Sequence, residues 1–278
     1  MSAYSEQDFL ADKYTTYRPK YPASFFQKLI SYHNGDKKLA VDVGCGPGEA
    51  TFPLSKYFDH VIGIDRSNVM VKQANQIKDL NGHKNVEFRT GNGEVLQLNT
   101  NSVDLVAAAE SLHWFDQSKF VQESYRLLRL GGTLAYWGYT DPVFVDYPDA
   151  SFIYNNYVYL EPEYLGPYWE TPGIDLLKAG YNHVELPPDL FGEVKRVDYE
   201  AGTRNREALV MKKQYYGTSQ LKNFMKTWSA YHIWCKVHPD SPDVIDLLFD
   251  DLKKNLHWTE ETVLNVEWNT FYVFATRM

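Results

Sequence analysis

The segment that most constrains the fold is a glycine-rich turn that follows a short apolar run. Residues 39–44 read LAVDVG, and the sequence continues as CGPG to Gly48. The apolar run predicts a buried β-strand, and the glycines predict a tight turn whose backbone can approach a ligand without a Cβ in the way. A helix is expected at about 48–58. This order of strand, turn and helix is typical of the first unit of a parallel α/β sheet.

The sequence up to residue 140 goes on alternating apolar runs with helical patterns. One helix carries apolar residues at Met70, Ala74 and Ile77, and a second begins near Phe120 and stops at Gly131-Gly132. Strands joined by such crossover helices run parallel. We therefore expect an α/β protein with a mostly parallel sheet and helices on both faces. Its further strands are expected at 60–65, 86–90, 103–110 and 133–140.

The alternation breaks after Thr140, in a region rich in Pro, Tyr and acidic residues. Residues 141–170 are expected to be irregular or short-helical, and Thr171 is expected to cap a short helix that ends before Gly180. Because the later helices outnumber the crossovers, we expect many of them to cover the sheet as a cap. The pattern predicts a strand at 193–199, a helix at 218–235, a helix starting at Ser241-Pro242 and a last strand at 263–276.

Composition excludes several classes of protein. The 278 residues have a formal net charge of −8 and no basic stripe, which argues against a nucleic-acid partner. Two cysteines, Cys45 and Cys235, are too few for a disulfide scaffold, and no Cys/His spacing matches a zinc site, so no metal is expected. Without a signal-peptide pattern or an apolar run of about 18 residues, we expect a cytoplasmic protein with no membrane span. We favour a monomer.

Two classes of ligand bind at a glycine turn of this kind, dinucleotides and S-adenosylmethionine. The dinucleotide pattern G-x-G-x-x-G fails here, because its third glycine falls on Glu49 when counted from Gly44 and on Thr51 when counted from Gly46. A carboxylate at Glu49 would also repel a pyrophosphate at the helix N-terminus. S-adenosylmethionine carries a sulfonium and no phosphate, so the turn favours it and makes an oxidoreductase a distant alternative.

Asp65 ends the second expected strand, about 20 residues past the turn. A carboxylate there can accept hydrogen bonds from both ribose hydroxyls of the cofactor. The alternative is that Asp65 caps the following helix. The turn that precedes it favours ribose binding.

In order, the chain carries VDVGCGPG at 41–48, GID at 63–65, GNGE at 91–94, AESLHWFD at 109–116 and LRLGG at 128–132. This order resembles class I S-adenosylmethionine-dependent methyltransferases. The resemblance implies a Rossmann-like, mostly parallel seven-stranded sheet with an antiparallel last strand, and a substrate cap inserted after strand five. It assigns to the cofactor site Tyr14, Tyr17, Arg18, Asp42, Gly44, Gly46, Asp65, Asn92, Gly93, Glu94 and Glu110. Asn92-Gly93 departs from the Asp-Ala that the family often has.

Four distal motifs extend the resemblance over nearly the whole chain. They are YTTYRPKYP at 14–22, GPYWE at 166–170, TWSAYHIW at 227–234 and EWNTFY at 267–272. In these motifs the chain is similar to fungal trans-aconitate methyltransferases and their cantharidin-methylating relatives. The similarity implies a small anionic acceptor, with S-adenosylhomocysteine and a methyl ester as products.

The chemistry of a carboxylate acceptor limits what the site needs. A carboxylate is ionised at neutral pH, so the protein has only to align the reactants and exclude water. His113 and Trp114 follow strand 103–110, where His113 could donate to the acceptor, act as a base or pack under the cap. Tyr139 is preferred to Trp137 because it lies nearer the strand end, and we expect the two to face different sides. Arg18 could instead pair with the acceptor carboxylate.

In the cap, the candidate acceptor-binding residues are Tyr168, Trp169, Trp228, Tyr231 and His232, with core packing as the alternative for Trp228 and His232. Four segments are expected: a lid and first helix (1–38), the cofactor core (39–140), the cap with remaining core elements (141–260) and the last strand (261–278). The leading hypothesis is a carboxyl O-methyltransferase. A methyltransferase for another small molecule, xenobiotic or lipid, and a non-catalytic cofactor-binding regulator, remain alternatives.

Overall fold

The computed structural model describes residues 3–9 and 11–278, so residues 1–2 and 10 of the predicted lid segment lie outside the description. One sheet runs through the molecule in the order β3-β2-β1-β4-β5-β8-β6, with β7 also paired to β8. Its strands are β1 (Leu39–Val43), β2 (His60–Asp65), β3 (Val86–Thr90), β4 (Val103–Ala109), β5 (Leu128–Phe144), β6 (Phe191–Tyr199), β7 (Met211–Tyr216) and β8 (Val263–Arg277).

The first five strands are parallel, and β8 runs antiparallel to β5, β6 and β7. The expected Rossmann-like α/β fold with an antiparallel last strand is therefore confirmed. The sheet has eight strands in the described part of the chain where seven were expected. The reason is that β6 pairs with 270–277 and β7 with 263–268, one after the other along the same edge of β8. Together they fill one position of a seven-position sheet.

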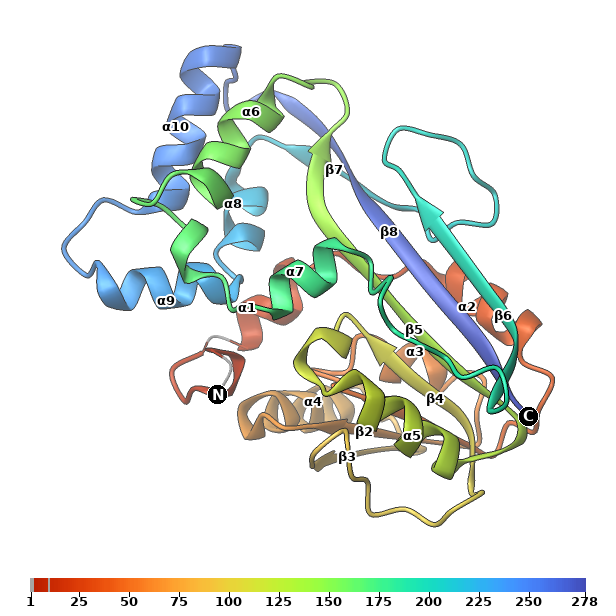
Figure 1. Ribbon diagram of the computed structural model, residues 1–278. Helices are drawn as coiled ribbons and strands as arrows, with labels where there is room; N and C mark the ends of the chain where they lie inside the picture. Colours follow the sequence, from red (N-terminus) through yellow and green to blue (C-terminus); the bar gives the residue numbers. More distant parts are fainter. Residues whose placement is uncertain (1–2, 10) are drawn as a thin grey trace.

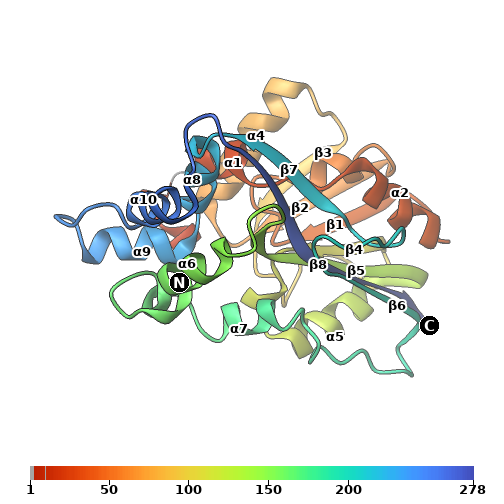
Figure 2. The ribbon, with the colours of Figure 1, turned by 90° about the horizontal axis from the view of Figure 1, so that it is seen from above.

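Helices lie on both faces of the sheet, and a group of them gathers where β5 and β8 extend beyond the core (Figures 1 and 2). We call this group, α6, α8, α9 and α10, the cap helices. None of the helices described is both long and apolar enough to cross a membrane. The helices are α1 (Ala11–Tyr17), α2 (Ala23–Tyr32), α3 (Thr51–Leu54), α4 (Asn68–Asn81), α5 (Gln117–Leu127), α6 (Ala150–Asn155), α7 (Gly173–Lys178), α8 (Ser219–Met225), α9 (Ser229–Val237) and α10 (Val244–Leu256).

Alternate residues of the strands feed two apolar cores, one on each face of the sheet. Val41 and Val43 join the core under α5, whereas Ala40 joins the core under α2, α3 and the cap helices. Trp137 and Tyr139 both lie in this second core. The prediction that they face different sides is wrong, because residues two apart on a strand share a face.

The predicted helix at 218–235 is two helices, α8 and α9, separated at 226–228. Trp228 is extended, with φ −76° and ψ 146°. The Thr227 hydroxyl donates to the Phe224 carbonyl at 2.6 Å, and Arg18 donates to the Thr227 carbonyl at 3.3 Å. These bonds use groups that a continuous helix would need, and one of them comes from 209 residues away.

Other element boundaries also differ from the sequence pattern. The helix after the glycine turn is only α3, and α5 ends at Leu127, before the Gly131-Gly132 stop. Pro172 rather than Thr171 precedes α7, and Asp243 rather than Ser241 caps α10 by accepting from the Ile245 and Asp246 amides. The strand β7 was not predicted.

Candidate active site

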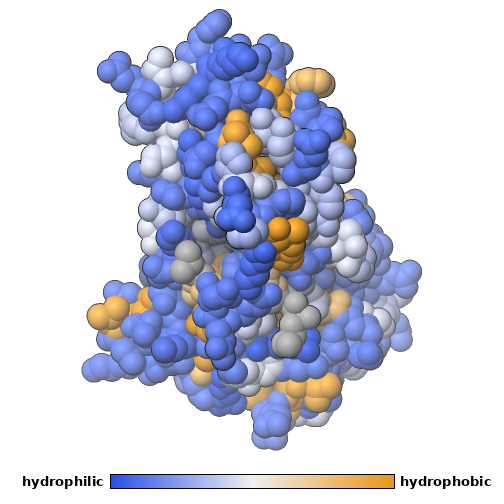
Figure 3. All heavy atoms as spheres, turned by 90° about the vertical axis from the view of Figure 1, so that its left-hand side faces the viewer, coloured by the Kyte–Doolittle hydropathy of each residue, from blue (hydrophilic) through white to orange (hydrophobic). Residues whose placement is uncertain are grey.

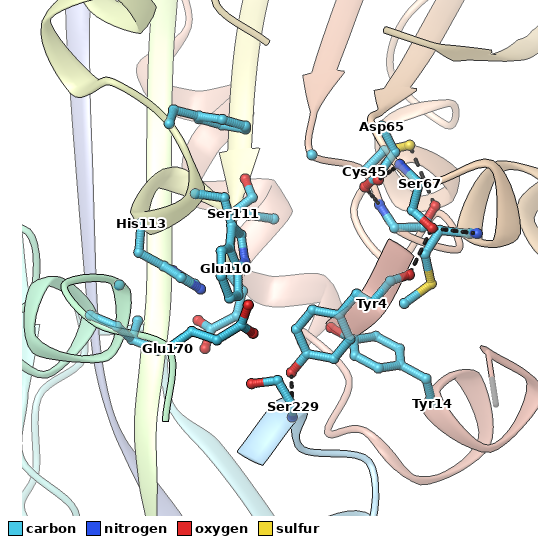
Figure 4. Close-up of a pocket in the computed structure, with 18 of the residues that line it drawn as sticks. Tyr4, Tyr14, Cys45, Asp65, Ser67, Glu110, Ser111, His113, Glu170 and Ser229 are labelled. Atoms are coloured by element: carbon cyan, nitrogen blue, oxygen red, sulfur yellow. Dashed lines mark hydrogen bonds between the residues drawn. The ribbon is translucent and has the colours of Figure 1, made fainter. Parts of the chain in front are cut away.

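A cavity of about 650 Å³ lies between the carboxyl ends of β1, β2 and β4 and the cap helices (Figure 4). Parallel sheets of this type bind ligands at that edge. The N-terminal segment also contributes to its wall, through residues 4–5, 14, 18–19 and 21. Figure 3 shows the face that carries the N-terminal segment as largely hydrophilic, with only separate apolar spots. The cavity thus joins the glycine turn, the ends of the parallel strands and the N-terminal segment in one site.

Glycines keep the backbone of the turn close to other parts of the site. A Cβ on Gly44, whose φ is +69°, would lie 2.4 Å from Cβ of Ser111. A Cβ on Gly93 would lie 2.6 Å from Val43. At Gly46, with φ +52°, no atom lies within 4 Å of the added Cβ, so this part of the turn faces open space. The turn forms a cradle that larger residues would fill or distort.

Asp65 stands at the end of β2 and fixes the turn. Its two carboxylate oxygens accept from the backbone amides of Gly46 and Ser67, each at 2.8 Å. Burial raises the pKa of Asp65 above its usual value. The Ser67 hydroxyl accepts from Met70 N and is the cap of α4. Asp65 therefore lies on the cavity wall with further lone pairs available to a ligand.

Asp42 lies behind the turn, fully buried, and does not line the cavity. The Thr51 hydroxyl donates to one of its oxygens at 2.6 Å, and the other oxygen has no hydrogen-bond partner among the described residues. Burial raises its pKa to about 7. The structure therefore places Asp42 outside the lining of the predicted cofactor site.

The loop after β3 reaches the same cavity. Asn92, Gly93 and Glu94 all line it, and the Asn92 side chain accepts from the Glu94 amide at 3.2 Å. From the N-terminal segment, Tyr14 and Arg18 line the cavity, whereas Tyr17 packs against the core outside it.

Arg18 is a buried cation, 8% exposed, and its hydrogen-bond partners among the described residues are all neutral. It donates to the Thr227 hydroxyl (2.9 Å) and carbonyl (3.3 Å) and to the hydroxyls of Tyr139 (3.2 Å) and Tyr4 (3.1 Å). Its guanidinium also lies over the Tyr14 ring, 4.6 Å from the centroid. Since buried charges are normally paired, Arg18 can receive an anion from the cavity.

Glu110 and His113 lie on one side of the pocket, opposite the glycine turn (Figure 4). Glu110 adopts φ +53° and accepts from the Tyr139 amide at 2.8 Å, and burial raises its pKa to about 8. Burial, with a smaller effect of the Arg18 charge, lowers the pKa of His113 to about 3. At neutral pH this side of the pocket holds a protonated acid and a neutral imidazole. Trp114 and Tyr139 line it as well.

The five candidates in the cap divide between the cavity and other contacts. Trp169 and Trp228 line the cavity, with ring centroids 5.6 Å apart. The other three lie outside the lining and use their polar groups elsewhere: Tyr168 bonds to His238 (2.7 Å), Tyr231 to Asp243 (2.6 Å) and His232 to Glu6 (2.9 Å).

Sequence reasoning missed Tyr4, Glu170 and Lys178, which also line the cavity. One Glu170 oxygen is buried without a hydrogen-bond partner in the described structure. Glu170 ends the GPYWE motif, so its position was visible in the sequence although its orientation was not. Tyr4 and Lys178 belong to no motif, and only the folded chain brings them to the site.

This geometry fits S-adenosylmethionine on two counts: a glycine cradle and an acid at the end of β2. The cavity is also large enough for a cofactor of this size with a small acceptor. A pyrophosphate would meet Glu49, which lines the same cavity. The site therefore defines a cofactor-dependent transferase.

The comparisons with known proteins agree. The family model for a methyltransferase domain matches residues 41–136. The chain is 33% identical to the probable S-adenosylmethionine-dependent methyltransferase CRG1 of Saccharomyces cerevisiae, over 99% of this chain and 98% of that protein. It is 28% identical to the methyltransferase tpcM of Aspergillus fumigatus, over 96% and 91%. A solved candidate type II methyltransferase from Anaeromyxobacter dehalogenans superposes with a TM-score of 0.70 at 24% identity, covering 92% and 97%. The chain belongs to the S-adenosylmethionine-dependent methyltransferase family.

Proposed function

We propose that this chain methylates a carboxylate of a small polyacid such as trans-aconitate, releasing S-adenosylhomocysteine and a methyl ester. Arg18 is the observation that carries the proposal. It is a buried cation on the cavity wall whose hydrogen bonds go only to hydroxyls and a carbonyl. A carboxylate of the acceptor would supply the missing counter-ion, and an Arg–carboxylate pair is among the stronger charge-assisted interactions.

The remaining residues follow from this arrangement. We assign Gly44 and Gly46 to the methionyl part of the cofactor, Asp65 to its ribose and 92–94 to its adenine. S-adenosylmethionine supplies an electrophilic methyl group, so that an O–CH3 bond forms as the CH3–S bond breaks and its electron pair stays on sulfur. An ionised carboxylate has no proton to lose. The protein therefore needs no base and no metal for this step, only alignment and exclusion of water.

The test is Arg18→Gln, which removes the charge and keeps a hydrogen-bonding side chain. We expect kcat/KM for the polyacid to fall by about 30- to 1,000-fold, the scale of losing one partner of a buried charge pair. Affinity for S-adenosylmethionine, measured by calorimetry, should change less than about threefold. The matched control is Arg204→Gln, at an exposed arginine, which should change neither quantity. A fall in cofactor affinity with an unchanged KM for the acceptor would assign Arg18 to the cofactor and refute this use of it.

A second candidate is methylation of a hydroxyl or amine, and Glu170 is the observation that favours it. Its orphaned oxygen could take the proton that such an acceptor loses. Burial raises the pKa of Glu170, opposed by hydrogen bonds from Ala3 and Ser229. Glu170→Gln should abolish turnover of a protic acceptor and leave that of a carboxylate nearly unchanged. Tight cofactor binding with no methyl transfer to either class would indicate a regulatory protein instead.

We propose that the reaction takes place in the cytosol and in a monomer. The support for the first is that Cys45 and Cys235 are both free thiols. The support for the second is that one chain provides both the cofactor side and the acceptor side of the cavity. The mass of the protein in solution, measured by light scattering with and without cofactor, tests the monomer.

A further inference from the structure

His113 is hydrogen-bonded to Tyr181, a residue that belongs to none of the sequence motifs. Tyr181 lies in the connection between α7 and β6, and its hydroxyl is 2.6 Å from Nδ1 of His113. The two rings are nearly parallel, with centroids 6.0 Å apart and an interplanar angle of 29°. Tyr181 is 1% exposed and does not itself line the cavity. In the described structure its hydroxyl is joined to the cavity wall through the hydrogen bond to His113.

The backbone holds Tyr181 in an unusual conformation to reach this position. Its φ is +54°, directly after Gly180 at +60°. Large side chains rarely adopt the left-handed region, and residues held there often lie at functional sites. The ring packs edge-on against Phe271 at 5.0 Å, which fixes the direction of the hydroxyl. The result is a rigid polar group aimed at one nitrogen of His113.

The hydrogen bonds decide which nitrogen carries the proton. Burial raises the pKa of Tyr181 well above its usual value, so the hydroxyl keeps its proton. The hydroxyl proton then needs an acceptor, because a buried unpaired donor is costly. Among the described residues, Nδ1 of His113 is the acceptor within reach. A neutral imidazole that accepts at Nδ1 carries its proton on Nε2.

We propose that Tyr181 is a positioning residue that holds His113 in the Nε2–H tautomer, so that His113 offers an N–H donor to the cavity. What His113 does with this N–H rests on the proposed function: the donor would bind the acceptor carboxylate beside Arg18. Figure 4 shows the His113 ring on the acceptor side of the pocket, across from Asp65 and the glycine turn. His113 is then a fixed hydrogen-bond donor and not a general base.

The tautomer can be read without any substrate. Long-range proton–nitrogen correlation spectra of histidine-labelled protein at pH 8 should show Nδ1 of His113 as an unprotonated acceptor and Nε2 as protonated, with His113→Gln to assign the signals. Tyr181→Phe should move both nitrogens toward values averaged over the two tautomers. The matched control is Tyr136→Phe, which removes a buried hydroxyl from the ring 6.3 Å from Tyr181 and should leave the spectrum unchanged. A proton on Nδ1 in the wild type, or no response to Tyr181→Phe, would overturn the proposal.

Kinetic measurements test whether the His113 N–H binds the acceptor. Tyr181→Phe should lower kcat/KM for the acceptor by about 3- to 30-fold, mainly through KM, as expected for loss of one oriented hydrogen bond. The melting temperature should fall by only a few degrees, the scale of one lost hydrogen bond. Cofactor affinity should be nearly unchanged, since the ring is kept. In a His113→Gln background, where an amide supplies the donor, Tyr181→Phe should have no further effect. Additive losses would overturn the positioning role. If no carboxylate is methylated, the proposed function fails while the spectra still decide the role of Tyr181.

Discussion

The two sides of the cavity are built in different ways. The cofactor side comes from short turns that follow adjacent strands β1, β2, β3 and β4, and its contacts depend on glycines and backbone amides. The side that we assign to the acceptor joins Arg18, Tyr139, Glu170 and Trp228, which are far apart in the sequence and line the cavity with their side chains. The backbone geometry of the cofactor side can therefore stay the same while the side chains of the opposite wall change. This agrees with a fold that serves many acceptors.

The largest effect should come from filling the cradle. Gly44→Ala places a methyl group 2.4 Å from Cβ of Ser111 at φ +69°, so we expect cofactor affinity to fall at least about 100-fold in calorimetry. Gly82→Ala is the control, because Gly82 has φ +67° and no atom within 4 Å of the added Cβ. It carries the same backbone strain without the collision. An equal loss of affinity in both variants would mean that strain, and not the cradle, is responsible.

A smaller loss should follow from removing the carboxylate at the end of β2. Asp65→Ala should weaken S-adenosylmethionine binding by about 1–3 kcal/mol, or about 5- to 150-fold, the range for hydrogen bonds to charged groups. Asp79→Ala, at an exposed position on α4, is the control. Unchanged affinity in Asp65→Ala would refute the assigned contact between Asp65 and the ribose. It would also weaken the contrast drawn between the two sides of the cavity.

The acids Asp42 and Glu110, one behind the cofactor turn and one on the acceptor side, predict a pH effect. Their pKa values in the folded chain, about 7 and about 8, are raised from 3.8 and 4.5. Above pH 6 the unfolded chain has released both protons, whereas the folded chain still binds them. The free energy of unfolding should therefore decrease by about 1–3 kcal/mol from pH 6.5 to 8.5.

Denaturant titrations at the two pH values measure this decrease. Asp42→Asn cannot ionise and should make it smaller, and Glu110→Gln should do the same from the other side of the cavity. His113 does not interfere, because its lowered pKa acts in the opposite range: its contribution to stability is lost as the pH falls below about 6.5. A stability that rises between pH 6.5 and 8.5 would contradict the assignment.

The smallest effect is expected in the cap, outside the cavity. Tyr168→Phe removes a hydrogen bond to His238 and should cost about 0.5–1.5 kcal/mol of stability, with turnover changed less than about twofold. Trp169→Leu, at the neighbouring residue that lines the cavity, should raise KM for the acceptor instead. A tenfold rise of KM in Tyr168→Phe would place this residue at the acceptor after all.

Sequence patterns located the cofactor half well and the cap poorly. The strands β1, β2 and β3 begin at their predicted residues, since apolar runs and glycine turns act over a few neighbours. The helix predicted at 218–235 failed because Arg18 bonds to Thr227 across the molecule. The strand β7 has the sequence MKKQYY and pairs along its whole length with β8. Neither event leaves a periodic signal.

The sequence by itself determined the class of this protein. The reason is that its main signals are local: a glycine turn, an acid 21 residues after Gly44, and a strand before each of them. Asp65 and the glycine turn could be proposed as cofactor residues before any fold was known, and the structure places both on the cavity wall. Only the tertiary structure decided that Arg18 has uncharged hydrogen-bond partners among the described residues, that Tyr231 and His232 are used elsewhere, and that the Tyr181 hydroxyl lies 2.6 Å from Nδ1 of His113. Burial and hydrogen-bond partners set the charge and tautomer of such groups, and both arise from contacts between distant segments.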